Sequence, residues 1–301
     1  MAAEKRMLFV GLSCLDIINV HDHYPEEDTD SRSTEQFFNR GGNASNTAVV
    51  ASQLGGCAEY IGTIASHILS EIIKEDLNKH QVKFENCSFH DDYRPPTSCV
   101  ILNSTNGLRT ILHANNSLPE LSVADFSKIN LAQYSWIHFE GRNIPNVLKM
   151  IELVENYNSM NDDDIKVSVE LEKSKTSDIE KLLSLGHVVF VSKEYVMNRG
   201  YTTSESALHG LHDGLRKGAV LICAWGSSGA WGRGVDGTIY HAPAYKPEKV
   251  VDTLGAGDTF NAGVIWALNR GRVLSDALNV GCKIAGRKCG MYGLSGIEEN
   301  E

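Results

Sequence analysis

The chain has 301 residues, with 28 Lys and Arg against 38 Asp and Glu, so its formal net charge at pH 7 is -10. This acidic balance gives no general attraction to nucleic acid or to an anionic membrane, and we expect neither as a partner. The seven cysteines include no C-x-x-C pair, which favours reduced thiols over a disulfide framework, and no apolar run approaches membrane-spanning length, so we expect a cytoplasmic location.

The first predicted elements are short strands. MLFVGL is typical of a buried strand, and CLDIINV continues extended, with Asp16 just past the first apolar run. TEQFFNR, TSCVILN and RTILHAN are further β-branched and aromatic runs, the last two joined through a turn at Asn106 and Gly107. We expect these strands, from about 14–40 and 96–115, to form a small antiparallel lid separate from the main core.

The rest of the chain alternates strands and helices. NASNTAVVASQLGG has helical spacing and begins after two glycines. From about residue 119, YSWIHFEG, IKVSVELE, HVVFVS and AVLICAWG alternate with amphipathic segments, and SDALNVGCKIAGRKCG predicts a last helix. This alternation predicts one domain over residues 1–301, a three-layer α/β/α fold with a mostly parallel sheet. Ligands of such sheets bind outside the carboxyl ends of the strands.

One stretch, VVDTLGAGDTFNAG, predicts an anion-binding site. Gly255, Ala256 and Gly257 stand directly before Asp258 and a helical run. Unpaired amides and the positive end of a helix dipole attract anions, and glycine allows a ligand to approach the backbone. Asp258 itself has two interpretations, an N-cap or first-turn acid and a functional carboxylate, and the three small residues before it favour the second.

Two common nucleotide-binding motifs do not apply. The chain has no G-x-x-x-x-G-K-[ST] sequence, which excludes a P-loop. A G-x-G-x-x-G sequence begins at Gly232, but VDGTIYHAP after its second glycine predicts a hairpin turn at Asp236 and Gly237 and then a strand. A dinucleotide-binding motif needs a helix there.

Polar residues in three places suit a polyhydroxylated substrate beside an anion. Asp16, Asn43 and Asn46 join Asp258 in offering carboxylate acceptors and amides that both donate and accept hydrogen bonds, which matches sugar hydroxyls. For the two asparagines, an N-cap and a first-turn polar residue remain the alternative.

The elements GGNASNTA and VDTLGAGDTFNAGVI together resemble the paired signatures of the ribokinase-like carbohydrate kinases, and the similarity extends over nearly the whole chain. Within that family, RGGNASN, IHFEGRN, VVFVSKE and VVDTLGAGDTFNA most resemble the members that phosphorylate ketohexoses. The resemblance implies ATP-dependent phosphorylation of the C1 hydroxyl of D-fructose to give D-fructose 1-phosphate. The alternatives are another ribokinase-like sugar or nucleoside kinase, and a catalytically silent sugar-binding protein on the same fold.

The resemblance also implies roles for individual residues. Asp258 is the expected catalytic base, and the amides of Gly255, Ala256 and Gly257 the expected anion hole. The residues expected to contact sugar are Asp16, Gly42, Asn43 and Asn46. The residues expected to contact the nucleotide are Arg109, which reaches an ATP phosphate, and the loop residues Gly226, Ser227, Ser228 and Gly229.

Metal ions and a partner chain complete what the resemblance implies. Magnesium is expected, and Glu194 fits the acid of the family's N-x-x-E motif and contacts the ion through water, although Val191 replaces the asparagine. Potassium is expected near Asp252 and Thr253. A homodimer is expected through the lid sheets, with YPEEDTD near the partner's site. The lid would exclude water from the site.

Overall fold

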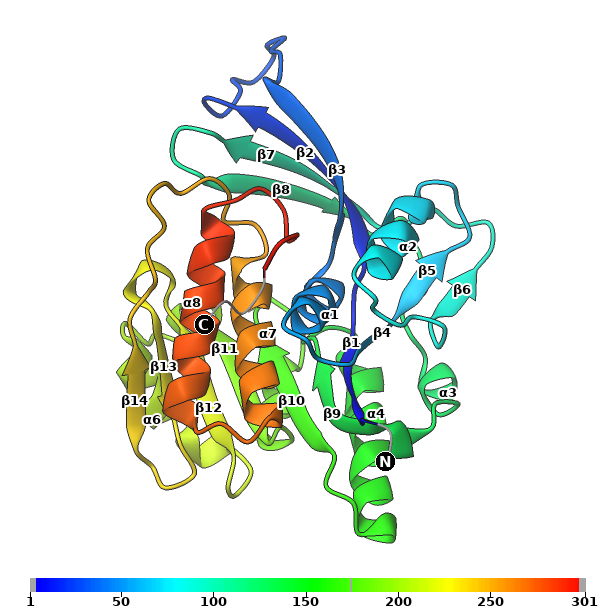
Figure 1. Cartoon of the computed structure of the whole chain (residues 1–301), viewed down its shortest axis with the longest axis vertical. Coiled ribbons are helices and arrows are strands. Elements are labelled where there is room, and N and C mark those ends of the chain that lie inside the picture. Colours follow the sequence, from blue (N-terminus) through cyan, green and yellow to red (C-terminus); the bar gives the residue numbers. More distant parts are fainter. Residues whose placement is uncertain (1–3, 174, 298–301) are drawn as a thin grey trace.

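A computed structural model (Figure 1) describes residues 4–173 and 175–297, and it is built around a twisted eight-stranded sheet. In spatial order the strands are β14 (Ile239–Ala242), β13 (Ala230–Arg233), β12 (Val220–Ala224), β11 (Val188–Ser192), β10 (Lys166–Leu171), β9 (Tyr134–Phe139), β1 (Arg6–Val10) and β4 (Ala58–Ile61). From β12 to β4 every pair is parallel, whereas β13 and β14 pair antiparallel. The mostly parallel sheet expected from the sequence is confirmed.

Helices cover both faces of this sheet. On one face lie α1 (Asn43–Gln53), α7 (Ala256–Asn269) and α8 (Leu274–Cys289), and on the other α3 (Val123–Phe126), α4 (Ile144–Asn161), α5 (Lys193–Met197) and α6 (Ser204–Gly210). Strand β1 shows why two layers are needed, because Met7 and Phe9 pack into one apolar cluster while Leu8 and Val10 pack into the other. Within the described residues, no helix has the length and apolarity that crossing a membrane requires.

A second sheet of four strands, called the lid sheet here, lies over one end of the main sheet (Figure 1). Its strands, in spatial order, are β3 (Glu35–Gly41), β2 (Cys14–His21), β7 (Thr97–Asn103) and β8 (Arg109–Ala114). The outer pairs are antiparallel, as expected, and the central pair of β2 and β7 is parallel. A small apolar cluster on its inner side contains Ile18, Val20, Val100 and Leu102, and Leu254 packs against it.

Other parts of the structure differ from the sequence-based expectation or were not predicted. The segment after β10 forms a 3-10 helix at Ile179–Ser184 where an amphipathic helix was expected. Strand β4, the pair β5 (Thr63–Ala65) and β6 (Ser88–His90), and helix α2 (Ser70–Lys79) were not predicted. Helix α2 packs against β2 and β3, at the base of the lid sheet.

Candidate active site

A cavity of about 470 Å3 lies at the carboxyl ends of the parallel strands, between them and the lid sheet. It is within the range of small-molecule sites. Half of the residues singled out in the sequence meet there, although they come from four parts of the chain. The lining includes Asp16, Gly42, Asn43, Asn46, Arg109, Gly255, Gly257 and Asp258.

The start of helix α7 forms one wall of the cavity. Gly255 is its N-cap and has φ of 76°, a left-handed conformation that glycine adopts readily. Asp258 is the third helical residue and no side chain caps the helix, so the N-cap interpretation of Asp258 is wrong and the first-turn position is right. Gly255 therefore provides no side chain that would compete with an anion for the first amides of α7, although the amide of Ala256 donates to Thr253 O at 3.3 Å.

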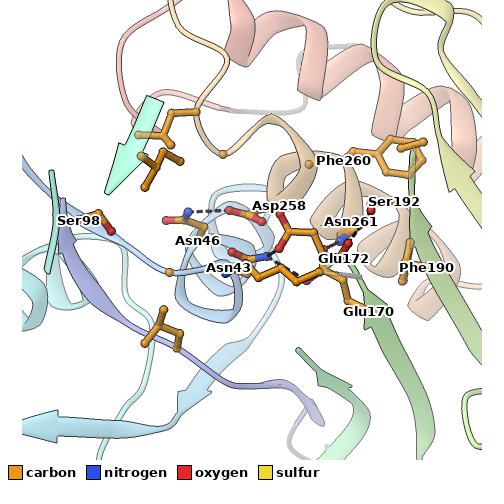
Figure 2. A pocket seen from close by; sticks show the side chains of 18 of the residues that line it. Asn43, Asn46, Ser98, Glu170, Glu172, Phe190, Ser192, Asp258, Phe260 and Asn261 are labelled. Atoms are coloured by element: carbon orange, nitrogen blue, oxygen red, sulfur yellow. Dashed lines mark hydrogen bonds between the residues drawn. The ribbon is translucent and has the colours of Figure 1, made fainter. Parts of the chain in front are cut away.

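Asp258 is 7% exposed, and the side-chain amide of Asn46 orients its carboxylate. Asn46 Nδ2 on α1 donates to Asp258 Oδ2 at 2.7 Å, a contact that is drawn in Figure 2. Burial raises the pKa of Asp258 to about 7, although the hydrogen bond from Asn46 acts in the opposite direction. A carboxyl with a pKa near neutral is suited to general-base catalysis.

Asn46 is held in turn by a buried arginine that sequence reasoning did not single out. Arg40 Nη1 donates to Asn46 Oδ1 at 2.6 Å, and its Nε donates to Asp76 Oδ2 on α2 at 2.7 Å. Burial acts to raise the pKa of Asp76, but His80 and Arg40 outweigh it and lower this pKa to about 2. The contact with Arg40 occupies the amide oxygen of Asn46, so its NH2 group must face Asp258. The only sequence signal was the position of Arg40 directly before the two glycines.

Asp16 approaches the cavity from strand β2 of the lid sheet. It is 6% exposed, and Cys14 Sγ donates to its Oδ1 at 3.3 Å. A Cβ atom on Gly41, in the neighbouring strand, would overlap the Asp16 carboxylate, which explains the need for glycine there. Burial raises the pKa of Asp16, an effect that hydrogen bonds from Cys14 and Ser98 oppose.

A pair of glutamates, Glu170 and Glu172, was also not predicted and lies beside Asn43 (Figure 2). Asn43 Nδ2 donates to Glu172 Oε2 at 2.8 Å and to Glu170 Oε2 at 3.3 Å, while Asn261 Nδ2 donates to Glu170 Oε1 at 2.8 Å. Burial, together with the charges of Glu172, Asp258 and Glu140, raises the pKa of Glu170 well above its usual range. Because the string VELE was interpreted only as a strand, these acids were missed.

Arg109 reaches the cavity from β8. Its Nη1 donates to Thr253 Oγ1 at 3.0 Å, and that hydroxyl donates to Gly107 O at 2.9 Å. The β7–β8 hairpin of the lid sheet therefore contacts the loop that leads into α7.

Other residues singled out in the sequence lie elsewhere. Of the residues that the structure describes, Glu194 on α5 and the loop at 226–229 are not among those lining the cavity, nor is Ala256. The loop at 226–229 follows β12, and Ile222 and Ala224 of that strand do line the cavity. The Asp252 carbonyl accepts a hydrogen bond from Lys288 and that of Thr253 accepts one from Ala256, so potassium at these carbonyls stays a prediction.

Comparisons with known proteins show the family and the fold of this chain. The sequence matches the family described as pfkB family carbohydrate kinase over residues 4–300. It is 44% identical over 296 residues to ketohexokinase of Mus musculus, covering 98% of this chain and 99% of that protein. It is 23% identical to a fructosamine kinase of Bacillus subtilis, over 92% and 90% of the two chains. A putative ribokinase from Agrobacterium tumefaciens superposes with a TM-score of 0.84 at 19% identity, over 97% of this chain and 93% of that one.

Proposed function

This chain belongs to the pfkB family of carbohydrate kinases, and we propose that it transfers the γ-phosphoryl group of ATP to the C1 hydroxyl of D-fructose. The observation that carries the proposal is the position of Asp258. Its carboxylate lies at the start of α7, bonded to Asn46, in a cavity that Asp16 and Asn43 also line. The preference for a ketohexose is supported by the 44% identity to a ketohexokinase.

Asp258 is the proposed base. Asn46 occupies Oδ2, which leaves Oδ1 to accept the proton of the attacking hydroxyl. The sugar oxygen then bonds to the γ-phosphorus as the bond from phosphorus to the β-phosphate oxygen breaks, and ADP leaves. General-base catalysis contributes about a hundred- to ten-thousand-fold, so positioning and charge stabilisation must supply the remainder.

The amides of Gly255, Ala256 and Gly257 are the proposed anion hole, because the N-cap of α7 is a glycine and has no side chain that could accept hydrogen bonds from them. Magnesium would enter with the nucleotide and neutralise charge on its phosphates. Among the described residues no three His, Cys, Asp or Glu side chains are grouped as metal ligands. Magnesium needs only one or two carboxylates beside substrate phosphates, and Glu172 of the cavity wall fits that role, whereas Glu194 is not among the residues described as lining the cavity.

The decisive test is sugar-dependent release of ADP from ATP. We expect turnover with D-fructose to exceed turnover with ribose or adenosine, and phosphorus NMR to place the product phosphate on C1. A preference for ribose or adenosine would indicate another kinase of the family. Fructose binding without ADP above the sugar-free control would indicate a silent sugar-binding protein.

The activity should depend on pH through Asp258. Its pKa of about 7 in the folded protein means that the carboxyl is protonated below that pH and cannot accept a proton. We therefore expect kcat/KM for the sugar to rise about tenfold per pH unit up to about pH 7 and then to level. Initial rates at limiting sugar, from pH 5.5 to 9, provide the measurement. A flat profile over this range would exclude a titrating base with this pKa.

Arg109→Ala should raise the KM for ATP and change sugar binding little. The planar guanidinium suits phosphate oxygens, and Arg109 lines the cavity from a strand of the lid sheet. Loss of one charged contact predicts roughly a tenfold increase. Arg94→Ala, another exposed arginine that is not among the cavity-lining residues described, is the matched control. An unchanged KM for ATP in Arg109→Ala would remove this role.

A homodimer through the lid sheets is also proposed. Phe38, Ile17, Cys99 and Leu112 pair in register across the four strands, on the face opposite Asp16. Phe38 and Leu112 are 49% and 60% exposed, so this row is apolar surface that a second chain could cover. YPEEDTD lies in the exposed connection between β2 and β3. A light-scattering mass of one chain at micromolar concentration would contradict the dimer.

A further inference from the structure

Lys288, in the last turn of α8, is fully buried. Lysine is among the residues least often buried completely, because an ammonium group loses its hydration and needs compensating contacts. The complete burial of Lys288 therefore implies that other groups compensate its charge.

The ammonium has three oxygen acceptors, one for each of its donors. Lys288 Nζ donates to Asp252 Oδ2 at 2.6 Å, to Asp252 O at 3.0 Å and to Met291 O at 3.3 Å. One carboxylate and two backbone carbonyls thus surround a single positive charge, which is how a small bound cation is coordinated. Here the cation is covalently attached to the chain.

The same group of atoms connects three segments. Asp252 Oδ1 accepts from Leu254 N at 2.8 Å, and Oδ2 accepts from Gly293 N at 3.3 Å. The amide of Val251 donates to Cys289 O at 2.7 Å. The ion pair therefore holds the end of α8, the segment after it and the loop before α7 in one arrangement.

That loop determines where the start of α7 lies. Only Thr253 and Leu254 stand between Asp252 and Gly255, the N-cap of α7. A displacement of Asp252 is thus passed on to the amides and the carboxylate at the cavity. Misplacement of reacting groups by about 1 Å can cost about a hundredfold in rate.

We propose that Lys288 is a positioning residue whose ammonium acts as a built-in cation under the loop before α7. It touches no substrate, and it acts by fixing Asp252 and, through it, Gly255 to Asp258. This inference rests on the proposed function, since the positioned groups are the base and the anion hole. It also means that an activating potassium ion has to share the oxygen atoms of Asp252 with Lys288.

The test is rescue of Lys288→Ala by small cations. Removal of the three outer methylenes and the ammonium group leaves a space beside a carboxylate without its ion-pair partner, which ammonium, methylammonium or potassium can enter. We expect kcat to fall about tenfold to a hundredfold in tetramethylammonium chloride and to recover in part when ammonium replaces it at constant ionic strength. The KM for the sugar should change little. Lys79→Ala, an exposed lysine in the last turn of α2, is the control and should respond to these salts as the parent does.

A folded Lys288→Ala with normal kcat in tetramethylammonium would overturn the proposal, as would a loss that no small cation restores. If Lys288→Ala does not fold, Lys288→Met combined with Asp252→Asn removes both charges without leaving either unpaired. Normal kcat in that folded double variant would also overturn it.

Hydrogen exchange of the peptide spanning 250–258 separates this inference from the proposed function, because it needs no substrate. Exchange should be faster in Lys288→Ala and slower again with ammonium. If the parent chain releases no ADP with any sugar tested, the proposed function fails while this readout still decides the role of Lys288. Identical exchange in the parent and the variant would refute that role.

Discussion

Asp258→Asn should lower kcat by about a hundredfold or more while the protein folds and binds D-fructose with near-normal affinity. Asparagine keeps the shape of the side chain and can present its Oδ1 to Asn46 Nδ2, so the buried contact survives. What is lost is the ability to accept a proton. Because burial disfavours the charged carboxylate, the neutral variant should unfold at the same or a higher temperature.

The measurements are kcat by ADP release, fructose binding by calorimetry and the unfolding temperature. Asp276→Asn is the matched control, since Asp276 occupies the third position of α8 as Asp258 does in α7 but is exposed. Near-normal turnover in folded Asp258→Asn would show that Asp258 is only a first-turn acid. Loss of activity in Asp276→Asn as well would indicate that replacing an acid in the first turn of a helix lowers activity in itself, without removal of a catalytic base.

Gly257→Ala should reduce kcat by about a hundredfold or more without destabilising the fold. Gly257 is helical and a Cβ atom there meets no heavy atom within 4 Å, so alanine fits and should stabilise the helix by up to about 1 kcal/mol. The Cβ of a helical residue tilts toward the N-terminus of the helix. In this position it enters the cavity and obstructs an anion approaching the first amides of α7.

Thermal unfolding and steady-state kinetics of this variant separate stability from activity. Gly214→Ala is the control, because its Cβ would have one neighbour at 3.9 Å and Gly214 lies in a 3-10 helix that contributes no described residue to the cavity. Full activity in Gly257→Ala would place the transferred phosphoryl group away from these amides. A lowered unfolding temperature would instead attribute the loss to the fold.

The sequence was informative wherever the pattern was local. Alternating apolar strands and amphipathic segments predicted the parallel sheet, and Asn106 with Gly107 predicted the β7–β8 hairpin. The 3-10 helix at Ile179–Ser184 was not separable from an α-helix, because three apolar residues in so short a run suit either form. The parallel pairing of β2 with β7 joins segments some 80 residues apart, and no local pattern specifies it.

The same holds for the site, where residues in local motifs could be predicted and residues held by contacts between distant segments could not. Asp258, Asn46 and Asp16 were identified because motifs mark them. Arg40 was missed because its role depends on contacts: its partner Asp76 lies on α2, a helix that was not predicted, and the pair meets only in the folded chain. Glu170 was missed because an acid within a strand is usually solvated, whereas here Asn43 and Asn261 hold it in a buried place.

The position of Asp16 on the lid sheet has a thermodynamic consequence. Asp258 belongs to the main body, so a sugar bound as proposed would bridge two parts of the molecule that need not move together. The free energy of sugar binding then includes the free-energy difference between the arrangement of the lid sheet in the free protein and its arrangement in the sugar-bound protein. A second chain covering Phe38 and Leu112 on the outer side of that sheet would act on the same difference. By linkage, chain association and sugar binding would each change the other's equilibrium constant by the same factor.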